Sequence, residues 1–182
     1  GGRYSFAVRG SAAGSVGPKQ QLFYTSGVQN WINRDIDDDN GFPIDDVTDF
    51  VFATQVLPVR GYEINARNGS YFWLVNGEFR FPLIAAVLPG PIPVAPLYNL
   101  QGSAFLDVGG VWGGRNRGNK RFNVFMDDPA TGERVFDDLL LSAGLGLRTI
   151  LLGYPIRLDW ARPHNRQGFQ GHQFHFSVGL DF

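Results

Sequence analysis

Hydrophobic and polar residues alternate with a period of two along much of this chain. In the final segment every second position is apolar, at Phe174, Phe176, Val178, Leu180 and Phe182. The positions between them are polar or small, as at His175 and Ser177. Because successive side chains of a strand point to opposite faces, we expect a strand with an apolar face toward lipid and a polar face toward a wet lumen. An edge strand of a soluble sandwich is the alternative.

Segments of the same kind recur along the chain, each bounded by Gly, Pro, Asn or Asp. Together they predict about seven strands, over residues 3–13, 20–27, 70–82, 100–109, 139–151, 154–161 and 173–182. Most have a length near the roughly ten residues that cross a bilayer obliquely. Helical periodicity is nearly absent. The pattern therefore predicts an all-β chain that forms part of an antiparallel transmembrane β-barrel.

The predicted polar faces carry several ionisable side chains. These are Glu78, Arg80, Asp107, Arg148, Arg157 and Asp159. A dry protein core would not accept so many, because an unpaired buried charge is strongly unfavourable. A water-filled lumen would accept them, and this favours a barrel. In the alternative, these faces are the solvent side of a sandwich whose apolar faces pack together.

The connections between the predicted strands differ in length. Residues 28–67 and 110–138 are expected to form long loops, whereas Gly153 and Tyr154 mark a tight turn. Alternation of short turns with long loops is typical of outer-membrane barrels. We therefore interpret residues 1–182 as one barrel segment with no second domain.

The composition further narrows the class of protein to which the chain can belong. The formal net charge is −1, so no basic field points to nucleic acid. The chain has no Cys, which excludes disulfides and thiolate chemistry, and no apolar run long enough for a transmembrane helix. Its 24 Gly and 14% aromatic residues suit a barrel with aromatic girdles. Because the chain opens on Gly1 without Met or a hydrophobic leader, we expect a mature chain, a truncated chain or a fragment.

One acidic segment is a weak candidate for a calcium site. Asp35, Asp37 and Asp39 precede a Gly, as in loops that wrap Ca²⁺, but the spacing departs from the EF-hand pattern. A solvated acidic loop is the alternative. The three histidines near the end of the chain are interpreted as solvated rather than metal-bound, with His175 facing inward. No arrangement singles out a nucleophile, so we expect neither an enzyme nor a cofactor.

A second candidate lies in the first long loop. Residues 59–62 read Val-Arg-Gly-Tyr and follow Pro58. Glycine allows a tight reversal there, and arginine can reach a carboxylate. The carboxylates Glu78 and Asp107 lie on the next two predicted strands at similar depths. Arg60, buried against both of them, would hold the loop inside the barrel.

An ordered set of motifs resembles the C-terminal part of the bacterial surface antigen family, the BamA-like superfamily of outer-membrane assembly factors. The set begins with Val-Arg-Gly-Tyr and continues through five later segments. In order these are NGEFRFP at 76–82, FLDVGGVW at 105–112, SAGLGLR at 142–148, PIRLDWARP at 155–163 and FHFSVGLDF at 174–182. Each motif alone is weak, whereas their shared order is specific. The acidic segment and its lead-in at residues 31–34 resemble versions whose barrel follows a propeller-like region.

The resemblance implies a sixteen-stranded barrel in the bacterial outer membrane, of which this chain supplies the C-terminal part. It also implies that Arg60, with Gly61 and Tyr62, anchors the long loop on lumen carboxylates of the two following strands. Those carboxylates correspond to Glu78 and Asp107. A further implication is an assembly signal in the last strand. That signal is carried by Phe174, Phe176, Gly179, Leu180 and Phe182.

The resemblance further implies a non-enzymatic function, the insertion or translocation of proteins at the outer membrane of Gram-negative bacteria. The implied partners are the lipid bilayer, the N-terminal remainder of the barrel or a partner chain, and client proteins or assembly machinery. Two other barrel functions stay open. One is a small eight-stranded structural or adhesive barrel, and the other is a membrane anchor for a fused periplasmic or surface domain.

Overall fold

The computed structural model describes residues 4–25, 27–34, 53–56, 58–83, 100–113, 121–165 and 168–179. A seven-stranded antiparallel sheet dominates this part of the chain, in the order β1-β5-β6-β9-β10-β11, with β12 also paired to β10. Its strands are β1 (Ser5–Gly14), β5 (Tyr71–Pro82), β6 (Gln101–Trp112), β9 (Leu139–Leu151), β10 (Tyr154–Asn165), β11 (Gly168–Phe169) and β12 (Gln173–Val178). The predicted all-β, antiparallel architecture is confirmed. No helix in these residues is long and apolar enough to cross a membrane.

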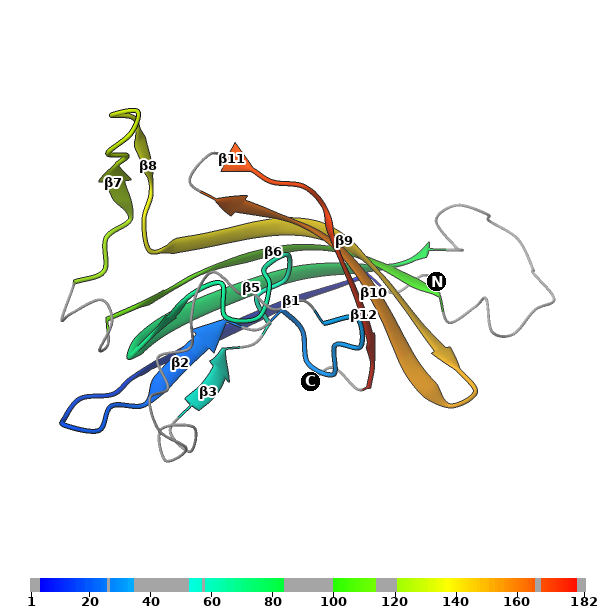
Figure 1. Ribbon diagram of the computed structural model, residues 1–182. Coiled ribbons are helices and arrows are strands. Elements are labelled where there is room, and N and C mark those ends of the chain that lie inside the picture. Colours follow the sequence, from blue (N-terminus) through cyan, green and yellow to red (C-terminus); the bar gives the residue numbers. More distant parts are fainter. Residues whose placement is uncertain are drawn as a thin grey trace.

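The long strands form one curved sheet (Figure 1). Its two faces differ in polarity. The outer face exposes large apolar side chains, including Phe6, Val8, Leu145, Trp160 and Phe174. Such a continuous apolar surface is unfavourable in water, whereas membrane strands present it to hydrocarbon. The strands β1 and β12 are the two edges of the sheet, and the described residues do not pair them with each other.

The strand registers place the connections at two ends of the sheet. Leu152 and Gly153 make the tight β9–β10 turn, with φ of 53° and 84°, the left-handed geometry of a two-residue hairpin. Residues 15–70 and 113–138 connect strands at the opposite end, as the predicted alternation requires. The β5–β6 connection, residues 83–100, joins two strand ends on the side of the tight turn, so the connections on that side are not all short.

The connection between β1 and β5 folds back beneath the polar face of the sheet (Figure 1). It forms a three-stranded sheet of β2 (Leu22–Thr25), β3 (Ala53–Val56) and β4 (Asn68–Gly69), in which β2 and β3 are parallel. The prediction of a barrel strand over residues 20–27 is therefore wrong. The strand β2 has only 4 residues, and its Phe23 and Thr25 are buried. A strand enclosed by protein needs no lipid-facing side, which explains its ambiguous alternation.

The connection between β6 and β9 also contains regular structure. The strands β7 (Phe125–Asp127) and β8 (Arg134–Phe136) pair as an antiparallel hairpin. This hairpin projects beyond the end of the large sheet (Figure 1). At the base of the hairpin the rings of Phe125 and Phe136, which face each other in the register, stack with their centroids 5.3 Å apart.

An apolar cluster joins the folded-back connection to the inner face of the sheet. It contains Phe23, Val56, Val59, Tyr62, Ala66, Leu74, Val111 and Leu140. The inner face is therefore packed against protein here, whereas the sequence suggested a water-filled lumen. Among the charged residues of this face, Glu78 and Asp107 pair with Arg60 of the folded-back connection, and Glu78 also pairs with Arg80 and Arg148.

Candidate functional site

Residues 59–62, which we call the loop motif, lie against the inner face of the large sheet. Val59 is 1% exposed and Arg60 is 3% exposed. Gly61 has a φ of 84°, and a Cβ at this position would lie 3.1 Å from both Ala161 Cβ and Pro163 Cδ of β10. Glycine is required here for two reasons, the left-handed backbone and the close approach to β10.

Arg60 bridges two strands of the sheet through its guanidinium. Its Nε and Nη2 donate to the two carboxylate oxygens of Asp107 on β6, at 2.8 and 2.7 Å. Its Nη1 donates to Oε2 of Glu78 on β5 at 2.9 Å. The backbone N–H of Arg60 also donates to Asp107, at 3.2 Å. Bidentate pairing with a carboxylate fixes both the position and the orientation of the arginine.

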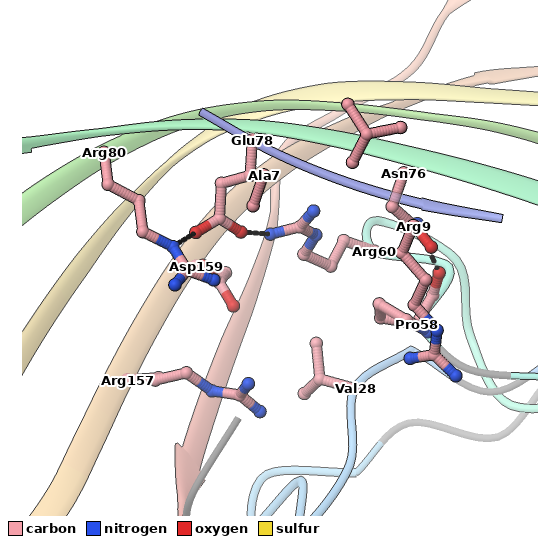
Figure 2. A pocket seen from close by; sticks show the side chains of 11 residues that line it. Ala7, Arg9, Val28, Pro58, Arg60, Asn76, Glu78, Arg80, Arg157 and Asp159 are labelled. Atoms are coloured by element: carbon pink, nitrogen blue, oxygen red, sulfur yellow. Dashed lines mark hydrogen bonds and ion pairs between the residues drawn. The ribbon is translucent and has the colours of Figure 1, made fainter. Parts of the chain in front are cut away.

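Glu78 accepts hydrogen bonds from two further arginines. Its Oε1 accepts from Arg80 Nε at 2.7 Å, and its Oε2 accepts from Arg148 Nη2 at 2.7 Å. Figure 2 shows Glu78 between Arg80 and Arg60, with Asp159 on the same cavity. The cavity has a volume of about 30 Å³, which is room for about one water molecule. The inner face at this depth is thus a dense network of charges.

The surroundings of Arg60 keep it charged. Its guanidinium lies 3.5 Å from the ring centroid of Phe105, which shields the ion pairs from water. Burial alone would lower the pKa of Arg60, but the hydrogen bonds and charge of Asp107, with the charges of Asp159 and Glu78, raise it above its ordinary value. The carboxylates therefore face a permanent cation.

The loop motif also contacts the last strand of the sheet. The Gly61 N–H donates to His175 Nε2 at 2.7 Å, which places the ring proton on Nδ1. His175 is 0% exposed, so the interpretation of the histidines as solvated is wrong for this residue. Sequence reasoning placed His175 on the inward face but missed its partner, because that partner is a backbone group in a distant loop.

Tyr62 ties the loop motif to β9 and β10. Its hydroxyl accepts from the Leu141 N–H at 3.0 Å and donates to the His164 carbonyl at 2.8 Å. Leu141 and His164 face each other where the pairing of the two strands ends. Burial raises the pKa of Tyr62 to about 12, so the hydroxyl keeps its proton and remains a donor.

Replacing Tyr62 with Phe is expected to lower the free energy of unfolding by about 1–2 kcal/mol, because half-buried backbone groups of Leu141 and His164 lose their partner. Urea unfolding of the purified protein in detergent, followed by tryptophan fluorescence, measures the change. Tyr4→Phe is the matched control, since Tyr4 is 62% exposed on the outer face. Equal stability of the two variants would contradict the role given to the Tyr62 hydroxyl.

The residues of the predicted terminal signal are placed away from this network. Phe174 and Phe176 alternate with the buried His175 on β12, and Phe174 is 49% exposed. Gly179 follows the strand with a φ of 146°. Leu180 and Phe182 lie outside the described residues.

The predicted calcium candidates Asp35, Asp37 and Asp39 also lie outside the described residues. Within the residues that the structure does describe, no group of three or more His, Asp or Glu could hold a metal ion. The chemistry of the described site is that of fixed ion pairs, which can immobilise a loop.

One contributor to the site had no signal in the sequence analysis. Asn76 Nδ2 donates both to Asp107 Oδ1 at 2.8 Å and to the Pro58 carbonyl at 3.0 Å. It therefore holds the start of the loop motif to the carboxylate that binds Arg60. Asn76 opens the motif at residues 76–82 and is two residues from Glu78, so it falls on the same face of the strand, but a polar face does not identify which side chains bind a loop.

Comparison with known proteins supports the architecture. A family model described as the Omp85 superfamily domain matches residues 2–182. No curated protein and no solved structure shows a significant match. The matched range includes the loop motif and every strand of the large sheet.

Proposed function

Because the chain belongs to the Omp85 superfamily, a family of outer-membrane barrel proteins that insert or translocate proteins, we propose that this barrel itself inserts or translocates protein clients. The membership confirms the resemblance of the motifs to the BamA-like barrel region. It also places the chain in a family of the outer membrane.

The observation that carries the proposal is the bridge made by Arg60. One loop residue pairs with Glu78 on β5 and with Asp107 on β6, and all three are at most 6% exposed. The loop motif is thereby fixed to strands in the middle of the sheet, while β1 and β12 are edges. A rigid interior beside the edge strands of the sheet suits a barrel that receives an incoming strand by pairing at the seam. The mechanism is mechanical and electrostatic, and no bond is made or broken.

The packing of the folded-back connection argues against a small eight-stranded barrel. Side chains alone fill the interior of a barrel of that size. Here the inner face carries a three-stranded sheet, β2 to β4, and the loop motif. A larger barrel has room for them. We further propose that the remainder of the barrel, or a partner chain, pairs with the edge strands β1 and β12 within the lipid bilayer, since unpaired strand edges are strongly unfavourable in hydrocarbon.

Reconstitution tests the proposal. The native protein, purified from membranes, is placed in liposomes, and a urea-unfolded outer-membrane barrel protein is added as client. We expect faster appearance of folded, protease-resistant client than in liposomes that hold an unrelated barrel. A second experiment uses an exported soluble client and measures how much of it becomes protected from protease inside the liposomes. If the protein increases neither the folding of the first client nor the protease protection of the second, the barrel is structural or an anchor, and the proposal is wrong.

A further inference from the structure

A cavity of about 210 Å³ lies beside the tight turn between β9 and β10. Its walls carry arginines from three different strands, Arg80 on β5, Arg148 on β9 and Arg157 on β10. No Asp or Glu is among the described residues that line it. Arg80 and Arg157 also line the smaller cavity of about 30 Å³ (Figure 2). We call the larger one the arginine cavity.

Two of these arginines face each other across neighbouring strands. Arg148 and Arg157 are partners in the register of β9 and β10, so their side chains leave the same face of the sheet. Like charges in directly opposed positions destabilise a strand pair. Arg157 is 7% exposed and the Arg148 side chain is 13% exposed, so bulk water screens their repulsion poorly. An anion between them would stabilise this arrangement.

The carboxylate that pairs with two of the arginines is shared with a third cation. Glu78 accepts from Arg80 and Arg148 at 2.7 Å each, and from Arg60 at 2.9 Å. A single carboxylate carries one negative charge, so it does not neutralise all three guanidinium groups. Positive charge therefore remains beside the arginine cavity.

The other described groups around the cavity do not remove this excess. Arg157 donates to neutral groups, the Ser177 hydroxyl at 3.0 Å and the Gln29 carbonyl at 3.3 Å. Asp159 lines the smaller cavity and offsets part of the charge. Over the whole network the arginines outnumber the carboxylates, with Arg60, Arg80, Arg148 and Arg157 against Glu78, Asp107 and Asp159.

We propose that the arginine cavity binds the carboxylate of an aspartate or glutamate side chain of a client polypeptide. A guanidinium presents its N–H donors as a planar fork that matches a carboxylate. Glu78 already orients Arg80 and Arg148, so the incoming group has less side-chain freedom to restrict. Ile150 and Pro155 give the cavity an apolar wall, which suits the methylene part of such a side chain.

The inference rests on the proposed function, which brings unfolded polypeptide to the barrel. In outer-membrane barrels the short turns lie on the periplasmic side, and this cavity lies beside the tight turn at Leu152 and Gly153. An exported client reaches that side first. Its aspartate and glutamate side chains are the oxyanions that it brings there, and a concentration of positive charge speeds their association.

Gln101→Glu tests the cavity because it changes the charge of the lining at nearly constant shape. Gln101 lines the cavity and faces Arg148 in the register of β6 and β9. A carboxylate at this position takes the place of the client carboxylate. The variant should therefore unfold at a higher urea concentration than the native protein, and it should bind acidic peptides more weakly.

Two rhodamine-labelled peptides measure carboxylate binding to the native protein in non-ionic detergent. One alternates Ser and Asp, and its analogue has Asn in place of each Asp. By fluorescence anisotropy, the acidic peptide should bind about tenfold more tightly than the analogue, as expected for one charge-assisted hydrogen bond. Gln101→Glu should remove this difference. Gln55→Glu is the matched control, because it adds the same charge on β3, outside the cavity lining, and should preserve the difference.

A second variant removes a cation from the cavity. Arg80→Gln changes the arginine whose side chain is 26% exposed, and it should weaken binding of the acidic peptide several-fold. Equal affinity of the native protein for the two peptides overturns the proposal. Selective binding of the acidic peptide that both Gln101→Glu and Arg80→Gln leave unchanged also overturns it. Phosphorus NMR that detects binding of inorganic phosphate, without binding of the acidic peptide, indicates a small-anion site and overturns it as well.

The liposome experiments distinguish failure of this site from failure of the proposed function. Native protein that inserts or translocates a client, but binds the two peptides equally, would leave the proposed function standing and remove the carboxylate site. Selective binding of the acidic peptide that Gln101→Glu abolishes, without insertion or translocation of either client, would retain a carboxylate site and remove the proposed function.

Discussion

Replacing Arg60 with Met is expected to lower the free energy of unfolding by about 3–5 kcal/mol, because it leaves buried carboxylates without their cation. Asp107 is 1% exposed and loses both of its bonds from the guanidinium. Glu78 is 6% exposed and keeps Arg80 and Arg148, so the larger part of the effect should come from Asp107. Methionine preserves much of the side-chain volume, and lost packing should therefore contribute little.

Urea unfolding of the purified protein in detergent, followed by tryptophan fluorescence, measures this loss. Arg60→Lys keeps a charge but lacks the planar guanidinium. Its free energy of unfolding should lie between those of Arg60→Met and the native protein. Arg60→Met combined with Asp107→Asn removes both charges and should recover part of the stability. Arg121→Met changes an exposed arginine and should stay within about 0.5 kcal/mol of the native protein. An Arg60→Met protein as stable as that control would show that the ion pairs do not hold the fold.

Six strands of the large sheet were predictable from the sequence, because their environment imposes a simple alternation of side chains. Each has lipid on one side, so its apolar residues recur at every second position. The observed strand Leu139–Leu151 coincides with the predicted range 139–151, and Tyr71–Pro82 lies within 70–82. The strand Leu22–Thr25 was assigned to the wrong sheet, since protein surrounds it and its alternation carries no information on facing.

The contacts of the candidate site were predictable in part. The sequence suggested Arg60, Glu78 and Asp107 as one group, and the structure brings them together. Two charges on adjacent strands at similar depth are a usable signal, because strand register follows from alternation. The contact of His175 with Gly61 was not foreseen. It depends on where a connection of residues 15–70 returns to the sheet, and no local pattern specifies that path.

The residues that cover the edge of β12 also could not be predicted from the sequence. Residues 31–33 belong to no predicted strand, yet they satisfy the edge of β12 through one backbone group and one side-chain amide. Strand prediction counts side-chain alternation over several residues, and so it misses an amide that imitates a peptide. The physical requirement is only that the edge groups find partners, and the sequence can meet it in more than one way.

Replacing Gly144 with Ala is expected to lower the free energy of unfolding by about 3 kcal/mol, at the upper end for an overpacked core. A Cβ at this position would overlap the Trp160 carbonyl oxygen and the Phe105 ring, and would lie 2.9 Å from Ala161 Cα. Two of these three atoms belong to the β10 backbone, which cannot move without breaking its pairing with β9. The third atom belongs to the Phe105 ring, which stacks against Arg60. A displaced ring should also weaken the ion pairs of the loop motif.

Gly10→Ala is the matched control for this change. Gly10 is also inside a long strand, β1, but a Cβ there would meet nothing within 4 Å. The free energy of unfolding of Gly10→Ala should stay within about 0.5 kcal/mol of the native value or rise slightly, because alanine restricts the unfolded chain. Phe105→Leu frees space beside position 144 and should recover part of the loss when combined with Gly144→Ala. If both alanine variants unfold at the same urea concentration, the close approach at Gly144 does not limit the packing of β9 against β10.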